Sequence, residues 1–269
     1  MADPQAVRAV LDDLRAESEA LDGLVAGLGT QQWSATTPAV GWTVAHQIAH
    51  LAWTDDQALL AVRDPDRFAV ELALAAVQFE THVDKQAAAG AATAPSALLA
   101  RWRAGREQLQ AALDTAPPDA RFPWFGPPMS TASMATARLM ETWAHGEDVA
   151  DTLGVRRAPT ARLWHVARIA VRARDYAFAV HGATPPAEPF RVELTSPDGA
   201  LWTYGPEQAV QKVTGPALDF CLLAVRRRHR DDTAVRAQGP GADAWLSIAQ
   251  AFAGPPGPGR APGAGGGAA

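Results

Sequence analysis

The amino-acid sequence predicts an α+β protein in which an all-α bundle is followed by a small α/β domain. Apolar residues recur at helical spacing, between capping residues, through residues 1–184. After the run PPAEP at 185–189 the pattern changes to FRVELTSPDGALWTYGP, in which two short alternating runs flank Pro197-Asp198-Gly199. That arrangement is typical of a β-hairpin. We therefore expect a helical domain over 1–184 and an α/β domain over 185–253.

Helix-start and helix-stop signals divide the first domain into successive helices. Asp3 and Pro4 begin a helix that ends at Gly29, and Thr43 is an N-cap for a second helix to about Val62. The further helices are expected at 67–89 (a looser, Ala-rich one), 95–114, 130–154 and 160–181. In the second domain we expect a strand at 209–214, a helix at 216–228, a short strand around Val235 and a last helix at 243–252. The Gly- and Pro-rich tail, 254–269, has too few apolar side chains to pack and is expected to be disordered.

Composition excludes several classes of function. The formal net charge is −5, from 24 Lys and Arg against 29 Asp and Glu, so we expect no nucleic-acid partner. Apolar runs nowhere reach the 18 residues of a membrane span, and the charged N-terminus does not resemble a secretion signal. The single cysteine, Cys221, lies in the apolar run DFCLLAV and is expected to be a buried structural thiol. A cytoplasmic location follows as the expectation.

The helix at 130–154 carries a candidate pair of metal ligands. In RLMETWAHGEDVADTLG, residues Glu141, His145 and Asp148 follow at i, i+4 and i+7 and share one helix face. A carboxylate and an imidazole one turn apart can close on one cation, although the spacing alone favours a solvated polar face. Asp148 is either a hydrogen-bond acceptor that orients a metal-binding imidazole without touching the metal, or a surface charge, and the sequence leaves both open.

The second helix supplies a candidate third ligand, and its two histidines differ. In GWTVAHQIAHLAWTDDQ, at 41–57, His50 lies near the border of the apolar face, whereas His46 lies about 40° further out. With Thr43 as N-cap, His46 is at N3, the position from which a capping-box side chain reaches back to the cap. His50 with Glu141 and His145 would make a three-ligand site with an open position, as in catalytic zinc sites. Zinc is the first expectation, and nickel, iron, manganese or cobalt also suit these ligands.

Three segments resemble a known family: GWTVAHQIAHLAW, RLMETWAHGEDVADTLG and VTGPALDFCLLAVRRRHRDD. They are similar to the DinB-like metal-binding superfamily, and more closely to its mycothiol-dependent maleylpyruvate isomerase-like branch. The resemblance implies a four-helix bundle with His50, Glu141 and His145 as the metal ligands. It also implies an arginine contributed by the C-terminal domain, for which Arg227 is the best match. The alternative for Arg227 is that its cluster complements a helix C-terminus.

The resemblance implies a reaction in which the open metal position binds the thiol of mycothiol and lowers its pKa. We expect a metal-dependent enzyme that uses this low-molecular-weight thiol for isomerisation or S-transfer on a small electrophilic substrate, with Arg227 holding a substrate carboxylate. The alternatives are a non-catalytic ligand-binding or regulatory metalloprotein, and a metal-water hydrolase or cyclase. The chain departs from the isomerase pattern by a longer insertion at 63–95, and the loop ARFPWFGPPMS resembles a less characterised metal-binding subgroup, which leaves the substrate open. The protein is expected to be a monomer or a homodimer.

Overall fold

The computed structural model describes residues 4–76, 79–117, 119–255, 257 and 259–263, and it confirms the α+β class. The chain forms two compact units that divide between Arg156 and Arg157. The sequence placed the domain boundary later, between residues 184 and 185. Helices α8 (Leu163–Arg172) and α9 (Arg174–Val180) belong to the second unit because α8 packs on α10 (Ala217–Ala224) and α9 packs on α11 (Pro240–Ile248).

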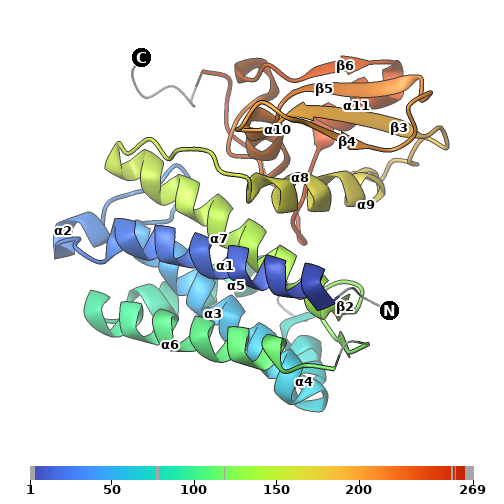
Figure 1. The fold of residues 1–269 in the computed structure, drawn as a ribbon. Coiled ribbons are helices and arrows are strands. Elements are labelled where there is room, and N and C mark those ends of the chain that lie inside the picture. The colour runs from blue at the N-terminus through green and yellow to red at the C-terminus, as the bar shows by residue number, and fades with distance from the viewer. Residues whose placement is uncertain (1–3, 77–78, 118, 256, 258, 264–269) are drawn as a thin grey trace. The chain divides into compact units, whose positions relative to one another are not determined.

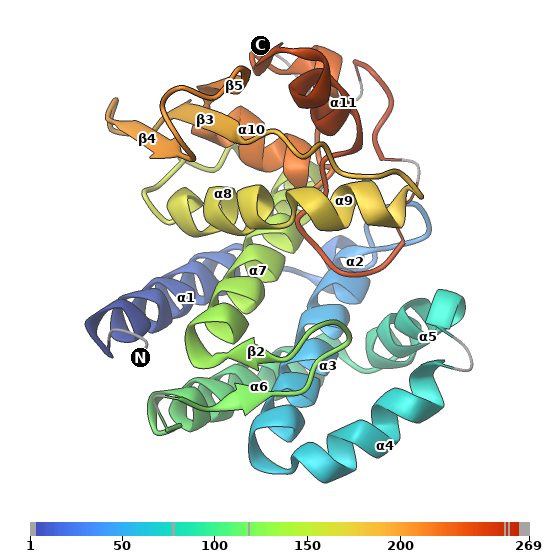
Figure 2. The same ribbon diagram turned by 90° about the vertical axis from the view of Figure 1, so that its right-hand side faces the viewer.

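The first unit is a bundle of four long helices, drawn from blue to green in Figures 1 and 2. These are α1 (Pro4–Val25), α3 (Val44–Arg63), α6 (Pro95–Asp114) and α7 (Thr131–Leu153). Helix α3 packs against both α6 and α7, and α1 packs against α7 and α6. The shared core includes Leu21, Ile48, Leu51, Leu98 and Trp102, each of them almost fully buried. The four-helix bundle implied by the family resemblance is therefore confirmed.

Local signals set the ends of the two helices that matter for the site. Thr43 is the N-cap of α3, and His46 at N3 completes a capping box with it. Ser130 caps α7 by accepting a hydrogen bond from the Ser133 N–H at 3.3 Å. Gly154 ends α7 in the left-handed conformation, with φ of 66°, which glycine adopts without steric cost.

The connections of the first unit differ from the expectation in two places. The looser helix expected at 67–89 is two helices, α4 (Pro65–Ala76) and α5 (Phe79–Ala91), and residues 77–78 lie outside the described part. A short helix, α2 (Thr30–Trp33), precedes α3, and the aromatic loop contains an antiparallel pair of two-residue strands, β1 (Arg121–Phe122) and β2 (Met129–Ser130). Such short elements leave no periodic pattern in a sequence. The expected N-cap Asp3 also lies outside the described residues.

The second unit carries a four-stranded sheet in the order β4-β3-β5-β6. The strands are β3 (Phe190–Thr195), β4 (Leu201–Tyr204), β5 (Gln211–Pro216) and β6 (Arg236–Gln238). The predicted hairpin is confirmed as the antiparallel pair β3 and β4, while β3 and β5 are parallel. The helix expected at 160–181 is divided at Ala173 into α8 and α9.

Two further predictions for the second unit differ from the structure. Helix α10 ends at Ala224 rather than at Arg228, because Arg226 takes a left-handed conformation with φ of 59° and the chain turns there. Of the tail expected to be disordered, residues 256, 258 and 264–269 lie outside the described part. The described part makes contacts: the Gly254 N–H donates to Tyr176 Oη at 3.1 Å, and the Gly263 N–H donates to the Asp232 carboxylate. Within the described residues, helices that are both long and apolar enough for a membrane span are absent.

Candidate metal centre

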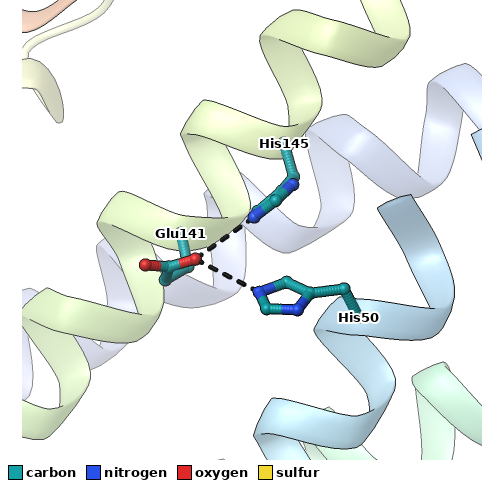
Figure 3. A group of neighbouring side chains, drawn as sticks. All are labelled: His50, Glu141 and His145. Carbon is teal, nitrogen blue, oxygen red and sulfur yellow. Dashed lines mark hydrogen bonds and ion pairs between the residues drawn. The ribbon is translucent and has the colours of Figure 1, made fainter. Parts of the chain in front are cut away.

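Three side chains from α3 and α7 converge at one point in the bundle. Figure 3 shows His50 on α3 facing Glu141 and His145, which lie one turn apart on α7. The Glu141 Oε2 atom is 3.4 Å from His50 Nε2 and 3.2 Å from His145 Nε2. One potential ligand atom from each residue lies within 4.8 Å of the others. The structure thus brings together the three residues that the sequence nominated as ligands.

The carboxylate of Glu141 is held in its charged form. Burial by itself raises the pKa of Glu141, but the hydrogen bonds and charges of His145 and His50 outweigh it and keep this pKa well below its usual value. The cluster therefore offers one anionic oxygen and two imidazole nitrogens. This donor set suits a divalent transition metal such as zinc.

The tautomer of His145 follows from a chain of hydrogen bonds through Gln47. The Thr37 hydroxyl donates to the Trp42 carbonyl oxygen at 3.0 Å, so it accepts from Gln47 Nε2 at 2.9 Å. The Gln47 amide thereby turns its Oε1 toward His145, and this oxygen accepts a hydrogen bond from His145 Nδ1. With its proton on Nδ1, a neutral His145 presents the lone pair of Nε2 to the carboxylate.

The orientation of the two imidazoles toward Glu141 indicates whether a cation fits the site. The hydrogen bonds and charges that keep the pKa of Glu141 low require protonated imidazoles. When His145 is neutral, its Nε2 lone pair and the ionised oxygen 3.2 Å away repel each other unless another positive charge lies between them. The neighbouring His50 points its own Nε2 at the same oxygen, while its buried Nδ1 has no hydrogen-bond partner among the described residues. A metal ion or a proton would relieve this repulsion, and three convergent donors fit the metal.

Aromatic rings enclose the two imidazoles. The Trp42 ring stacks on His145 with centroids 5.8 Å apart and an interplanar angle of 15°, and its centroid is 5.4 Å from that of His50. The indole Nε1 of Trp42 donates to Asp84 Oδ1, on α5, at 2.9 Å. The ring of Trp53 also lies near His50, with centroids 6.0 Å apart. These contacts shield the cluster from water and restrict the ring of each proposed ligand.

His46 lies outside the three-residue cluster. Its Nδ1 accepts from the Thr43 N–H at 3.3 Å and lies 2.8 Å from Thr43 Oγ1, so it serves as the capping residue predicted from the sequence. Burial lowers the pKa of His46, and the charge of Asp84 opposes that shift only in part. The neutral imidazole that a capping acceptor requires is therefore favoured.

The two other nominated residues have different surroundings. Asp148 is buried on α7, one turn after His145, but Gln47 is the residue that accepts from His145 Nδ1. Burial rules out the surface-charge alternative for Asp148, and its role as an acceptor that orients an imidazole stays a prediction. Arg227 follows α10 in the second unit, where its Nη1 donates to the Val225 carbonyl oxygen at 2.9 Å.

Sequence reasoning missed Gln47 and Asp84 as members of the site, and it placed Trp42 near the site without giving its contacts. A signal existed for Gln47, because it lies three residues before His50 on α3 and so shares a helix face with it. Trp42 precedes the N-cap, where helical phase gives no direction for a side chain. Asp84 is on α5, and no pattern in the sequence connects that helix to residue 42.

Two family models match the chain. The model described as the mycothiol maleylpyruvate isomerase N-terminal domain matches residues 14–150, more than half of the sequence. A second model, described as wyosine base formation, matches residues 186–238 in the second unit.

The chain is also similar to an uncharacterised relative and, in fold, to solved structures. An uncharacterised protein of Mycobacterium tuberculosis, in strains CDC 1551 / Oshkosh and ATCC 25618 / H37Rv, is 55% identical over 260 residues, covering 97% of this chain and 100% of the relative. The crystal structure of the mycothiol-dependent maleylpyruvate isomerase is similar in fold, with a TM-score of 0.58, 17% identity, and coverage of 88% of this chain and 95% of that one. A histidine-to-alanine mutant of that isomerase gives a TM-score of 0.58, 18% identity, and coverage of 87% and 95%. The chain therefore belongs to the mycothiol-dependent maleylpyruvate isomerase-like family, within the DinB-like group, as the sequence resemblance indicated.

Proposed function

We propose that this protein is a metal-dependent enzyme that uses mycothiol, or a similar low-molecular-weight thiol, for isomerisation or S-transfer on a small electrophilic substrate. Membership of the isomerase-like family supports the thiol as cosubstrate. The observation that most directly supports metal dependence is the convergence of His50 Nε2 and His145 Nε2 on one ionised oxygen of Glu141.

The donor set defines what the metal would contribute. Two imidazole nitrogens and one carboxylate oxygen leave a tetrahedral ion one further position, and zinc is the first choice for such ligands. A divalent ion held here would supply Lewis acidity that lowers the pKa of a coordinated thiol, so that a thiolate forms near neutral pH. The charge on Glu141 partly neutralises the ion, and Gln47 keeps the Nε2 lone pair of His145 available to it.

The chain's own thiol does not suit this chemistry. Cys221, the one cysteine in the sequence, is fully buried in the second unit, where its Sγ lies 3.5 Å from the Leu163 carbonyl oxygen. Burial raises the pKa of Cys221 well above its usual value and so suppresses the thiolate. An external thiol is therefore the more suitable nucleophile.

Arg227 is assigned, by family resemblance, to the substrate carboxylate. A guanidinium fork can hold a carboxylate through two parallel hydrogen bonds, which a lysine cannot reproduce. Arg227→Lys should therefore raise the KM for a carboxylated electrophile while metal content stays unchanged. An equal KM in the lysine variant and the wild type would contradict this role.

A titration of the cobalt-substituted protein with mycothiol tests the proposed function. Binding of the thiol as a thiolate to cobalt should produce a ligand-to-metal charge-transfer band that saturates with thiol concentration. The S-methyl derivative of mycothiol, which has no ionisable thiol, is the matched control and should produce no such band. Absence of the band at saturating mycothiol would refute the thiol chemistry and favour the metal-water hydrolase or binding-protein alternatives.

A further inference from the structure

A basic pocket lies in the second unit, where the chain turns after α10. Its volume is about 430 Å³, and its basic lining residues are Arg226, Arg228, His229, Arg230 and Arg260. The carboxylate of Asp231 is the one acidic group among the lining residues, and it is largely exposed. Everything that lines the pocket belongs to the second unit.

Two of these guanidinium groups have no carboxylate partner among the described residues. Arg226 Nε is buried without a hydrogen-bond partner, and Arg226 Nη2 has only the Gly257 carbonyl oxygen, at 3.5 Å. The side chain of Arg228 makes no hydrogen bond or ion pair to the described part of the chain. Burial lowers the pKa of Arg226, and no neighbouring charge opposes that shift. A partly buried cation without a counter-charge is unfavourable, so an anion would relieve it.

The backbone holds these donors in place. Arg226 is the one non-glycine residue with positive φ in the described chain, and its N–H bonds the Leu223 carbonyl oxygen at 2.9 Å. The next two N–H groups, of Arg227 and Arg228, both bond the Leu222 carbonyl oxygen, at 2.8 and 3.2 Å. The turn that directs Arg226 and Arg228 toward the pocket is thus fixed by three backbone hydrogen bonds, which reduces the ordering needed when a ligand binds.

The neighbouring polar groups of the pocket are also oriented. His229 Nδ1 accepts from the Asp231 N–H at 3.2 Å, so a neutral His229 carries its proton on Nε2 and can donate to a ligand. Arg230 is already paired, with its Nη2 2.5 Å from Asp243 Oδ1 and its Nη1 3.0 Å from Ser247 Oγ. Arg230 therefore contributes shape, while Arg226 and Arg228 provide the unbalanced charge.

We propose that the basic pocket binds a phosphate monoester. Such a group carries close to two negative charges near neutral pH, which matches two unpaired guanidinium groups, and its three oxygens accept several hydrogen bonds at once. A volume of about 430 Å³ exceeds what phosphate alone would fill and lies within the range of small-molecule sites. Leu223 and Leu246 also line the pocket and offer apolar surface to the organic part of the ligand.

Calorimetric titration of the full chain with glycerol phosphate, at constant ionic strength, tests this proposal. We expect saturable one-to-one binding that is tighter than for inorganic phosphate. Arg226→Gln and Arg228→Gln should each weaken it about tenfold or more, because each removes charge-assisted hydrogen bonds. Arg236→Gln is the matched control, since Arg236 is exposed on β6, outside the pocket, and should leave the affinity unchanged.

Several outcomes would overturn the proposal. Equal losses of glycerol phosphate affinity in Arg236→Gln and Arg228→Gln would show only non-specific attraction to positive charge. Tighter binding of malonate than of glycerol phosphate would indicate that the pocket is specific for a dicarboxylate and not for a phosphate monoester. The titration is repeated on Glu141→Ala protein, in which binding should persist; loss there would locate the anion at the metal centre instead. Circular dichroism shows whether each variant is folded. If Arg226→Gln does not fold, Arg228→Gln still tests the proposal, because the Arg228 side chain makes no hydrogen bond or ion pair within the described chain that the change would remove.

Discussion

Replacing Gln47 by leucine should weaken metal binding without removing a ligand. Gln47 is fully buried and leucine has a similar volume, so the change deletes the oxygen that accepts from His145 Nδ1 and the amide that donates to the Thr37 hydroxyl, with little change in packing. The His145 ring is then free to change tautomer and to rotate. Loss of one such partner typically lowers metal affinity about 10- to 100-fold. That range corresponds to about 1.4–2.7 kcal/mol of binding free energy.

Competition between the protein and a chromophoric chelator for zinc measures this loss. Gln47→Glu is the first matched control, because its carboxylate still accepts from His145 and should keep the affinity near that of the wild type. Thr54→Val is the second, since its hydroxyl, on the same helix, bonds only backbone carbonyl oxygens, among them that of His50 at 2.8 Å. Unchanged zinc affinity in a folded Gln47→Leu protein would refute the claim that Gln47 positions His145.

Further predictions concern the surroundings of the centre and the stability of the bundle. Asp84→Asn removes the charge that accepts from the Trp42 indole at 2.9 Å; we expect Trp42 fluorescence and the visible spectrum of the cobalt protein to change, and identical spectra would contradict the link. The hydrogen bond and charge of Arg103, together with those of Arg106, outweigh the effect of burial and lower the pKa of Asp22. The Asp22 carboxylate therefore stabilises the folded protein at pH values above its pKa in the unfolded chain. This contribution is lost as the pH falls through the lower pKa of the folded protein. Urea unfolding between pH 6 and 3 should therefore show a shallower acid dependence in Asp22→Asn, and parallel profiles would refute it. In the folded protein, Arg138 Nε donates to the buried carboxylate of Asp55, on α3, at 2.8 Å. Arg138→Leu leaves this carboxylate without a counter-charge and should lower the free energy of unfolding by about 3–5 kcal/mol. A loss below about 1 kcal/mol would contradict the pairing.

Helical phase and capping predicted the parts of the site that lie on long helices. The phase of α3 separated His50 from His46, and the structure places His50 beside Glu141 and leaves His46 at the cap. The one-turn spacing on α7 likewise predicted that Glu141 and His145 share a face. These inferences succeeded because they depend on backbone geometry that a helix repeats at every turn.

Features that depend on packing between segments were not predictable in the same way. The role of Gln47 depends on the direction of the Thr37 hydroxyl, which depends in turn on the Trp42 carbonyl in a loop without periodicity. The position of α8 was missed for a related reason. Periodicity predicts that one face of a helix is buried, but it does not name the element that covers it.

The metal content of two single-histidine variants tests the central claim most directly. His50→Ala and His46→Ala differ by one turn of α3, so purification and folding controls can be identical. After reconstitution with zinc and removal of excess ion, elemental analysis should find one ion per chain in the wild type and in His46→Ala, and none in His50→Ala. Retention of zinc by His50→Ala together with its loss from His46→Ala would contradict the proposed centre of His50, Glu141 and His145.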